Sequence, residues 1–242
     1  MIDMRSIRKI YRTQHVETHA LTNFTIRIEA GEFVSVMGPS GSGKTTLRNI
    51  AGLLDTFEEG RYFLDGEDVS QLNDREMSAI RNRKIGFIFQ SFNLIPDLNV
   101  FDNVDVPLRY RGMGAADRRE AIDRSLDVVG LSARTTHFPA QLSGGQQQRV
   151  AVARALVGKP SLILADEPTG NLDTAMANEI LDLLEQINAM DTTVVMVTHE
   201  PDLAARARRR LHLLDGRLID LEVEDRPRPL IGGAGVGAAA GI

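Results

Sequence analysis

The sequence predicts an α/β fold with a mainly parallel sheet, an antiparallel β subdomain and an inserted α-helical subdomain. Three short, continuous apolar runs, typical of strands covered on both faces, each end at a polar residue. These runs are residues 33–37, 162–165 and 193–198. Helical patterns lie between them and favour parallel connections. Because ligands in such folds bind at the carboxyl ends of the strands, we expect Gly38, Asp166 and His199 to meet at one edge of the sheet.

The remaining segments follow the periodicities of helices and strands. Apolar residues from Leu172 to Ile187 recur at helical spacing, which predicts an amphipathic helix. Residues 22–28 alternate in polarity and precede the turn-like residues 29–32, which predicts a hairpin. A second hairpin is predicted over residues 211–221, around an Asp-Gly pair.

The chain is expected to form one domain over residues 1–221. A mostly helical stretch rich in Arg and Asp predicts the inserted helical subdomain at about residues 91–156. Proline, glycine and alanine dominate residues 222–242, and this tail is expected to be disordered.

Composition excludes several classes of protein. The 242 residues include no cysteine, which excludes disulfides, thiolate metal sites and cysteine nucleophiles. A net charge of −5 provides no general field that would attract nucleic acid. The N-terminus lacks the apolar core of a secretory signal, and no stretch approaches the roughly 20 apolar residues that cross a bilayer. We therefore expect a soluble chain, or one that reaches a membrane through a partner.

Residues 38–45, with the sequence GPSGSGKT, match the phosphate-binding pattern G-x-x-x-x-G-K-[ST] between a predicted strand and a predicted helix. Lys44 is expected to bridge β- and γ-phosphate oxygens, and the Thr45 hydroxyl to bind Mg²⁺. A glycine loop without a ligand is the alternative, which the strand–loop–helix context disfavours. The segment predicts a P-loop NTPase core. Its predicted nucleotide-binding residues are Gly38, Pro39, Ser40, Gly41, Ser42, Gly43, Lys44, Thr45 and Thr46.

Four polar residues at strand ends complete the predicted chemistry. Asp166 is expected in the Mg²⁺ shell, and Glu167 is expected to polarise a water for in-line attack. A helix-cap acid and a solvent-facing neighbour are the alternative for this pair. His199 is expected to contact the γ-phosphate, although a lone histidine in this place is more often structural. Gln90 could reach the metal or the attacking water, or could cap the sheet.

Several motifs occur together in one order along the chain. They are the phosphate loop, Gln90, the segment Leu142-Ser143-Gly144-Gly145-Gln146, the strand end at Asp166-Glu167, Asn171-Leu172-Asp173 and His199. Over about residues 1–221 the chain resembles ATP-binding-cassette (ABC) ATPases. The stretches at 31–55, 84–108 and 141–156 resemble the subgroup that serves lipoprotein-release and macrolide-export transporters. A cell-division ATPase belongs to the same subgroup.

The resemblance implies a head-to-tail homodimer in which each ATP lies between the phosphate loop of one copy and the segment 142–146 of the other. Ser143, Gly144 and Gly145 would bind the γ-phosphate held by the partner copy, with Gln146 beside them. Gln146 to Gln148 would extend the polar start of the helix that follows. Ser143 is a good helix N-cap, and a helix N-terminus favours an anion. A capped helix without a ligand is the alternative.

Further roles follow from the same resemblance. Tyr11 would stack on adenine, although it could be simply a half-buried aromatic residue. Glu167 would be the catalytic carboxylate and Asp166 the metal-shell ligand, with Gln90 as a further metal ligand and His199 as the γ-phosphate sensor. Asp173 would lie at the dimer interface. Gln90 would also transmit the ATP state to a groove in the helical subdomain, where a membrane subunit docks.

Arg48 departs from the subgroup, in which an apolar residue is more usual. Arg48 lies one turn into the helix, and we expect its side chain to extend to solvent without disturbing phosphate binding. The arginine cluster at 206–210 is expected to form a solvated face rather than a nucleic-acid or lipid site.

The predicted function is that of an ATP-hydrolysing, Mg²⁺-dependent motor subunit of an ABC transporter, driving export or lipoprotein release through a separate transmembrane permease. It would lie in the cytoplasm, peripheral at the inner face of the cell membrane through that permease. Regulation of a membrane complex in cell division, without transport, is the alternative. ABC proteins that act on DNA or ribosomes carry insertions that do not fit here, and a P-loop kinase leaves Leu142–Gln146 unexplained.

Overall fold

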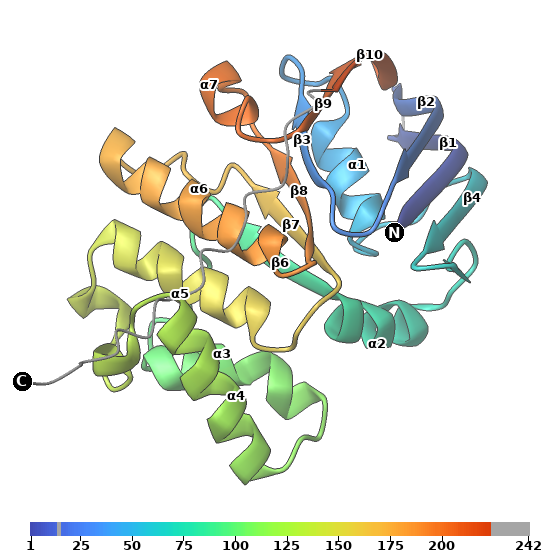
Figure 1. Cartoon of the computed structure of the whole chain (residues 1–242). Helices are drawn as coiled ribbons and strands as arrows, with labels where there is room; N and C mark the ends of the chain where they lie inside the picture. Colours follow the sequence, from blue (N-terminus) through green and yellow to red (C-terminus); the bar gives the residue numbers. More distant parts are fainter. Residues whose placement is uncertain (14–15, 224–242) are drawn as a thin grey trace, which may run out of the picture.

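The three apolar runs form adjacent parallel strands in a six-stranded sheet. The structure, a computed structural model, describes residues 1–13 and 16–223 (Figure 1). The sheet has the strand order β10-β9-β3-β8-β7-β6, and all its pairings except β9–β10 are parallel. The strands are β3 (Phe33–Met37), β6 (Ile85–Phe89), β7 (Leu162–Asp166), β8 (Thr193–Val197), β9 (Arg209–Leu214) and β10 (Arg217–Val223). The predicted mainly parallel sheet is confirmed.

An antiparallel sheet of four strands forms a second layer, in the order β2-β1-β4-β5. Its strands are β1 (Ile2–Arg12), β2 (Glu17–Ile28), β4 (Glu59–Leu64) and β5 (Glu67–Asp68). The hairpin predicted over residues 22–32 is wrong, because β2 pairs with the preceding β1 and the turn after β2 leads into β3 of the other sheet. This turn passes between layers, with Gly31 at a φ of 75°.

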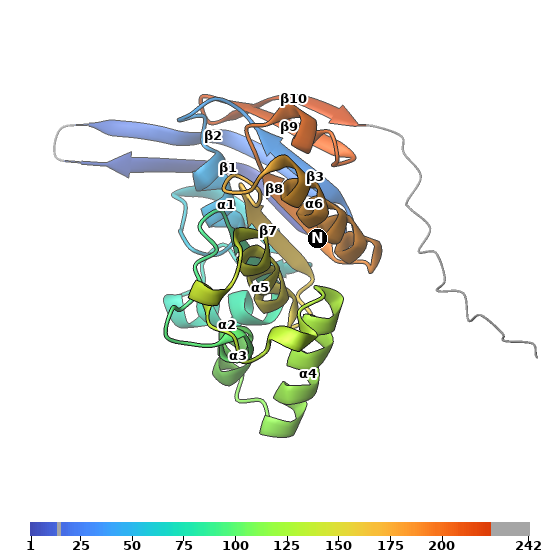
Figure 2. The ribbon, with the colours of Figure 1, turned by 90° about the vertical axis from the view of Figure 1, so that its left-hand side faces the viewer.

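Helices cover both faces of the parallel sheet (Figures 1 and 2). Between the two sheets lies α1 (Lys44–Ala51), and on the other face lie α5 (Gly144–Leu156) and α6 (Thr174–Ala189). The predicted helix at 172–187 is therefore confirmed. Helices α3 (Val100–Tyr110) and α4 (Ala115–Val128) pack on α5 to form the helical subdomain. The remaining helical elements are α2 (Asp74–Lys84), α7 (Pro201–Ala204) and short 3-10 turns at Ser132–Arg134 and Pro139–Gln141.

Strand periodicity divides the buried residues between two cores. Alternate residues of one strand face opposite sides of a sheet, and on β8 Val194 and Met196 contribute to the core beneath α5 and α6. Their neighbours Val195 and Val197 contribute to the core around α1 and the antiparallel sheet. Burial on both faces explains why these strands read as continuous apolar runs.

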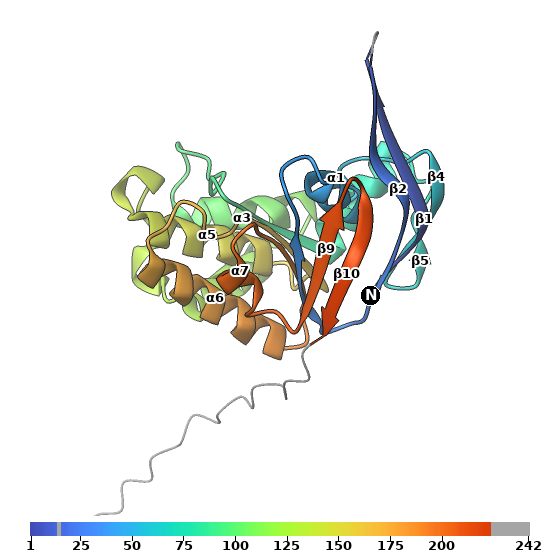
Figure 3. The same ribbon diagram turned by 90° about the horizontal axis from the view of Figure 1, so that it is seen from above.

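The second predicted hairpin forms from β9 and β10, with Asp215 and Gly216 both at positive φ as a two-residue hairpin turn requires. Figure 3 shows this hairpin between β3 and the antiparallel sheet. The Gly216 amide donates to Ser42 O at 3.0 Å, and the Thr22 amide donates to Gly216 O at 2.9 Å. The turn therefore joins the antiparallel sheet to the phosphate loop.

Some elements and boundaries differ from the prediction. Helix α2 was not anticipated, although Asn73 and Glu76 form a capping box at its start. Strand β10 continues through Val223 and so includes the first two residues of the predicted tail. The rest of the tail, residues 224–242, lies outside the described residues. Within residues 1–13 and 16–223, no helix combines the length and apolarity needed to span a bilayer.

Gly216 and Gly66 provide a matched test of the close packing at the β9–β10 turn. Both have positive φ, 71° and 78°, but a Cβ at Gly216 would lie 2.6 Å from Ala20 O, whereas a Cβ at Gly66 meets nothing within 4 Å. Gly66→Ala should lower the free energy of unfolding by about 1 kcal/mol, from the left-handed backbone alone. Gly216→Ala should lower it by about 3 kcal/mol, because overpacking is added.

Urea denaturation of the two variants measures this difference. Equal losses would show that the turn relaxes without cost and does not constrain the phosphate loop.

Candidate active site

The phosphate loop, residues 38–45, needs glycine at two positions for both φ and space. Gly38 has a φ of 149°, and a Cβ there would lie 2.2 Å from Leu213 O. Gly43, the N-cap of α1, has a φ of 103°, and a Cβ there would lie 2.5 Å from Ala20 O. Backbone from β9 and β2 therefore packs directly against the loop, which fixes its curvature.

A cavity of about 690 Å³ lies where β3, β7 and β8 end. It is lined by Met37, Gly38, Pro39, Ser40, Lys44, Glu167, His199 and His212. The Lys44 ammonium lies along the loop and donates to Gly38 O at 2.7 Å and Pro39 O at 2.8 Å. The structure thus brings together the loop, Glu167 and His199, as the parallel strand ends predict.

Glu167 and His199 form a hydrogen-bonded pair across the ends of β7 and β8. Glu167 Oε1 lies 2.7 Å from His199 Nδ1. Glu167 has a φ of 46°, and its amide donates to Val197 O at 2.9 Å, which fixes the residue against β8. The hydrogen bond to Glu167 raises the pKa of His199 above its ordinary value of 6.5. The hydrogen bond thus fixes the orientation of the Glu167 carboxylate through Oε1 and leaves Oε2 outside the pair.

Asp166 is paired with Arg48 of α1, which the sequence analysis did not anticipate. Arg48 Nη1 bonds Asp166 Oδ2, and only 13% of the arginine side chain is exposed. The expectation that Arg48 extends to solvent is wrong, because the carboxylate at the end of β7 and the face of Phe89 hold the guanidinium inside.

The residues predicted to hold Mg²⁺ all offer oxygen donors: a hydroxyl at Thr45, a carboxylate at Asp166 and an amide oxygen at Gln90. Mg²⁺ binds few protein ligands and takes its others from water and substrate phosphates. In the part of the chain that the structure describes, no group of three or more His, Cys, Asp or Glu could hold a metal on its own. The donor set fits Mg²⁺ that binds together with a nucleotide phosphate.

Gln90 follows β6 and lies against the segment that leaves β7. Asn171 Nδ2 donates to the backbone oxygen of Gln90 at 2.9 Å, and Gln90 Nε2 donates to Asn171 Oδ1 at 3.4 Å. A Cβ at Gly170 would lie 2.7 Å from Gln90 Nε2. Gln90 therefore contacts the chain between Glu167 and Asp173.

Tyr11 lies beside the start of α1. Its hydroxyl donates to Asp55 Oδ2 at 2.8 Å, and the Lys9 ammonium lies 5.0 Å from the ring centroid. Lys9 also pairs with Asp55 at 2.8 Å. The buried Thr46 side chain lies close to the Tyr11 hydroxyl. Lys9 and Asp55 were not predicted from the sequence, because their separation of 46 residues leaves no local signal for the pair.

The signature segment, Leu142–Gln146, starts α5 through a capping box. The Gln146 amide donates to Ser143 Oγ at 3.3 Å, and the Ser143 amide donates to Gln146 Oε1 at 3.0 Å. None of its residues is among those that line the cavity of the phosphate loop. Instead, a Cβ at Gly144 would lie 3.5 Å from Leu172, and Asp173 caps the following helix α6. The structure therefore does not bring the two glycine-rich segments together within one chain.

Gln148 differs from its expected place in a polar helix start. Its side chain is fully buried and donates to Pro168 O, at the end of β7. This contact ties α5 to the segment that carries Glu167.

The Glu167–His199 pair predicts a measurable titration. Glu167→Gln should lower the pKa of His199 toward 6.5, because the variant removes the carboxylate that stabilises the imidazolium. Since the folded-state pKa is raised, the pair contributes stability fully below about pH 6.5 and loses it as the pH rises through the raised pKa. NMR of the His199 ring protons against pH measures the shift.

Glu29→Gln is the matched control, since Glu29 pairs with Arg27 away from this site. An unchanged His199 titration in Glu167→Gln would contradict the hydrogen bond.

Known proteins are similar to this chain in sequence and in fold. A family profile described as ABC transporter matches residues 21–170. The chain is 49% identical over 219 residues to an uncharacterized ABC transporter ATP-binding protein, YknY of Bacillus subtilis, covering 90% of this chain and 95% of that one. It is 47% identical to the macrolide export ATP-binding/permease protein MacB of Syntrophobacter fumaroxidans, covering 89% of this chain. The chain spans only 31% of that MacB.

Solved structures agree with the sequence relatives. The dimeric post-hydrolysis state of the ATP-binding cassette MJ0796, bound to ADP and Pi, superposes with a TM-score of 0.84 at 42% identity. The match covers 92% of this chain and 98% of that chain. The predicted fold class is confirmed, and so is the resemblance stated from the motifs. The chain belongs to the ABC transporter family and is an ATP-binding ATPase domain of that family.

Proposed function

We propose that this chain is the motor subunit of an ABC exporter, which hydrolyses ATP to energise export or lipoprotein release through a separate permease. Relatives named as macrolide export ATP-binding/permease proteins support export. The chain corresponds to about a third of their length, 31% in one and 34% in another. In this proposal the permease is a different chain. These names favour export over regulation in cell division.

The main support for this proposal is the separation of the phosphate loop from the signature segment within one chain. The cavity holds Lys44, Glu167 and His199 but no residue of 142–146. Ser143 caps α5, and the first amides of a helix together with its dipole favour an anion. A second copy, turned head to tail, would place this helix start against the phosphates held by the first. The neighbour MJ0796 is described as dimeric, which supports this arrangement.

Residues of the cavity and of the adjoining strand ends then have roles in hydrolysis. Lys44 and the amides of the loop would bind the phosphates, and Thr45, Gln90 and Asp166 would hold Mg²⁺, which supplies charge neutralisation. Glu167 would accept a proton from the attacking water through the carboxylate oxygen that does not bond His199.

Adenine would stack on the ring of Tyr11. The Tyr11 hydroxyl donates to Asp55, which fixes the ring. Lys9 covers one face of the Tyr11 ring and leaves the other face for a base.

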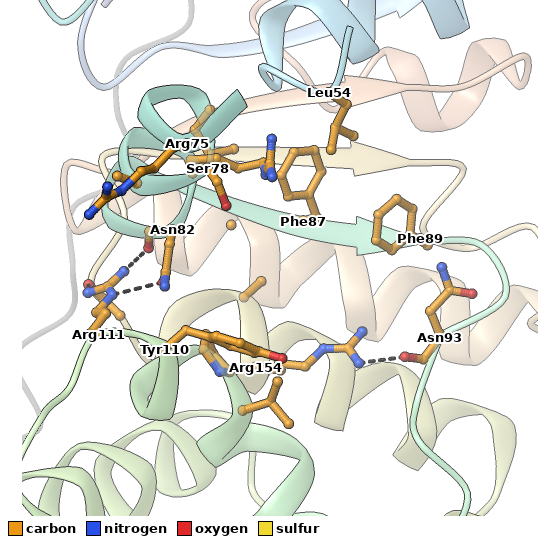
Figure 4. Close-up of a pocket in the computed structure, with 18 residues that line it drawn as sticks. Leu54, Arg75, Ser78, Asn82, Phe87, Phe89, Asn93, Tyr110, Arg111 and Arg154 are labelled. Atoms are coloured by element: carbon orange, nitrogen blue, oxygen red, sulfur yellow. Dashed lines mark hydrogen bonds between the residues drawn. The ribbon is translucent and has the colours of Figure 1, made fainter. Parts of the chain in front are cut away.

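A groove of about 740 Å³ lies between β6 and the helical subdomain, and we name it the lobe groove (Figure 4). It is the proposed docking site for the permease. Phe87 and Phe89 of β6 lie across this lobe groove from Tyr110 of α3. The lobe groove is also lined by Arg75, Arg81, Arg111 and Arg154, and its lining includes no Asp or Glu. A permease segment that carries both apolar and acidic side chains would complement the aromatic residues and the arginines of this groove.

Two of these arginines are held in place by neutral groups. Arg154 donates to Phe92 O at 2.8 Å and Arg111 to Gly158 O at 2.7 Å. Burial lowers the pKa of both, so a nearby carboxylate would stabilise their charge. This charge supports an acidic partner segment.

The strand β6 connects the lobe groove to the ATP site. Phe87 and Phe89 stack with centroids 5.7 Å apart, and Gln90 follows directly. A Cβ at Gly52, the C-cap of α1, would lie 2.6 Å from Phe87. Movement of α1 on ATP binding would therefore displace Phe87, which lines the lobe groove. With the permease docked in the lobe groove, the motor would lie in the cytoplasm at the inner face of the membrane.

Cross-linking tests the proposed docking. The chain has no cysteine, so Tyr110→Cys introduces a unique thiol, and Tyr110 is 82% exposed. In native membranes a short bifunctional thiol–amine reagent should join Tyr110→Cys to an integral membrane protein, identified by mass spectrometry. The variant should keep basal ATP hydrolysis, because Tyr110 lies outside the nucleotide cavity.

Met190→Cys is the control, since Met190 is 49% exposed and is absent from the lobe groove. Equal labelling of the same protein by both variants, or adducts with soluble proteins alone, would count against permease docking at this groove.

A further inference from the structure

Arg48 lies directly behind the phosphate loop. Helical residues three and four positions apart share a face, so Arg48 follows Thr45 and Lys44 on one side of α1. Its Nη1 bonds Asp166 Oδ2, and its Nη2 donates to Asn49 Oδ1 at 2.7 Å. Arg48 therefore links the helix of the phosphate loop to the end of β7.

This ion pair is shielded from solvent on both sides. The exposed fraction is 13% for the Arg48 side chain and 25% for that of Asp166. The Arg48 Cζ lies 5.9 Å from the centroid of the Phe89 ring. Charges in such a place interact more strongly than charges in water, unlike most surface ion pairs. The guanidinium is therefore a strong local charge at the metal-binding edge.

We infer that Arg48 acts as a counter-ion to Asp166 and lowers the affinity of the nucleotide site for Mg²⁺. The inference rests on the Mg²⁺ site proposed above. A divalent cation at this site meets a carboxylate whose charge Arg48 already offsets, and the positive guanidinium repels the metal. Arg48 also holds one carboxylate oxygen, Oδ2, and leaves Oδ1 outside the pair. Arg48 is thus a positioning residue that sets how strongly metal and nucleotide binding are coupled.

The decisive variant is Arg48→Leu, which removes the charge and keeps an apolar contact for Phe89. The measured quantity is the ratio of two dissociation constants for a non-hydrolysable ATP analogue, one in EDTA and one in Mg²⁺. The ratio should rise about tenfold in Arg48→Leu, because one unit of like-charge repulsion is removed from the metal. Isothermal titration calorimetry gives both constants, and neither requires hydrolysis, a dimer or a permease.

Two controls separate charge from structure. Arg48→Lys keeps the charge and should have a ratio near that of the unmodified chain. Arg124→Leu makes the same charge change on α4, where Arg124 pairs with exposed Glu120, and should leave the ratio unchanged. Analogue affinity in EDTA reports whether the phosphate loop is intact in each variant, and Arg48→Gln replaces Arg48→Leu if the latter does not fold.

An unchanged ratio in the folded neutral variant would overturn the inference, and so would an equal rise in Arg124→Leu. The unmodified chain tests the metal site separately. If its ratio is one and that of Arg48→Leu is higher, the inference stands and Arg48 masks the site. If the ratio is one in every variant, both the metal site and the role of Arg48 are wrong.

Discussion

Close backbone approach around the phosphate loop is the constraint on which the rest of the structure depends. A Cβ at Gly38 would lie 2.2 Å from Leu213 O, and a Cβ at Gly43 would lie 2.5 Å from Ala20 O, both too close for a side chain. Gly216 bonds Ser42 from the β9–β10 turn. Two hairpins from different sheets therefore meet at one loop, which couples the antiparallel layer to the parallel one. The parallel order of β3, β8 and β7 then brings Glu167 and His199 to the same edge.

The same edge carries the contacts that run from the phosphate loop toward the lobe groove. Asp166 ends β7 and bonds Arg48 of α1, while Gln90 ends β6 and bonds Asn171. Phe89, beside Gln90, contacts the Arg48 guanidinium and lines the lobe groove. A change at the phosphates thus has a short path of packed side chains to the surface proposed for the permease.

The sequence predicts the parallel strands and the catalytic edge because both depend on local patterns. Continuous apolar runs reveal strands buried on both faces, and the polar residue after each run marks the edge. The pairing of β2 with β1 was not predictable from the turn at 29–32, because strand pairing depends on which apolar faces are buried in the fold. For the same reason the alternation in residues 22–28 could identify a strand but could not identify its neighbour.

Contacts between distant residues are the part that sequence reasoning could not supply. Arg48, which was expected to extend to solvent, is instead partly buried in an ion pair, because a carboxylate 118 residues away lies beside it. Gln148 reads as one of three polar residues at a helix start, yet it is fully buried against Pro168. The capping box of Ser143 and Gln146, by contrast, lies within four residues and could be anticipated from the sequence.

The central claim is that one ATP site is completed by a second copy of the chain. Ser40→Cys in one preparation and Gly144→Cys in another, both with Glu167→Gln to slow hydrolysis, place single thiols on the two segments in an otherwise cysteine-free chain. Mixed with ATP and a short thiol cross-linker, the two should form a covalent dimer that neither forms alone or without ATP. Absence of this dimer although both variants bind ATP would contradict the account.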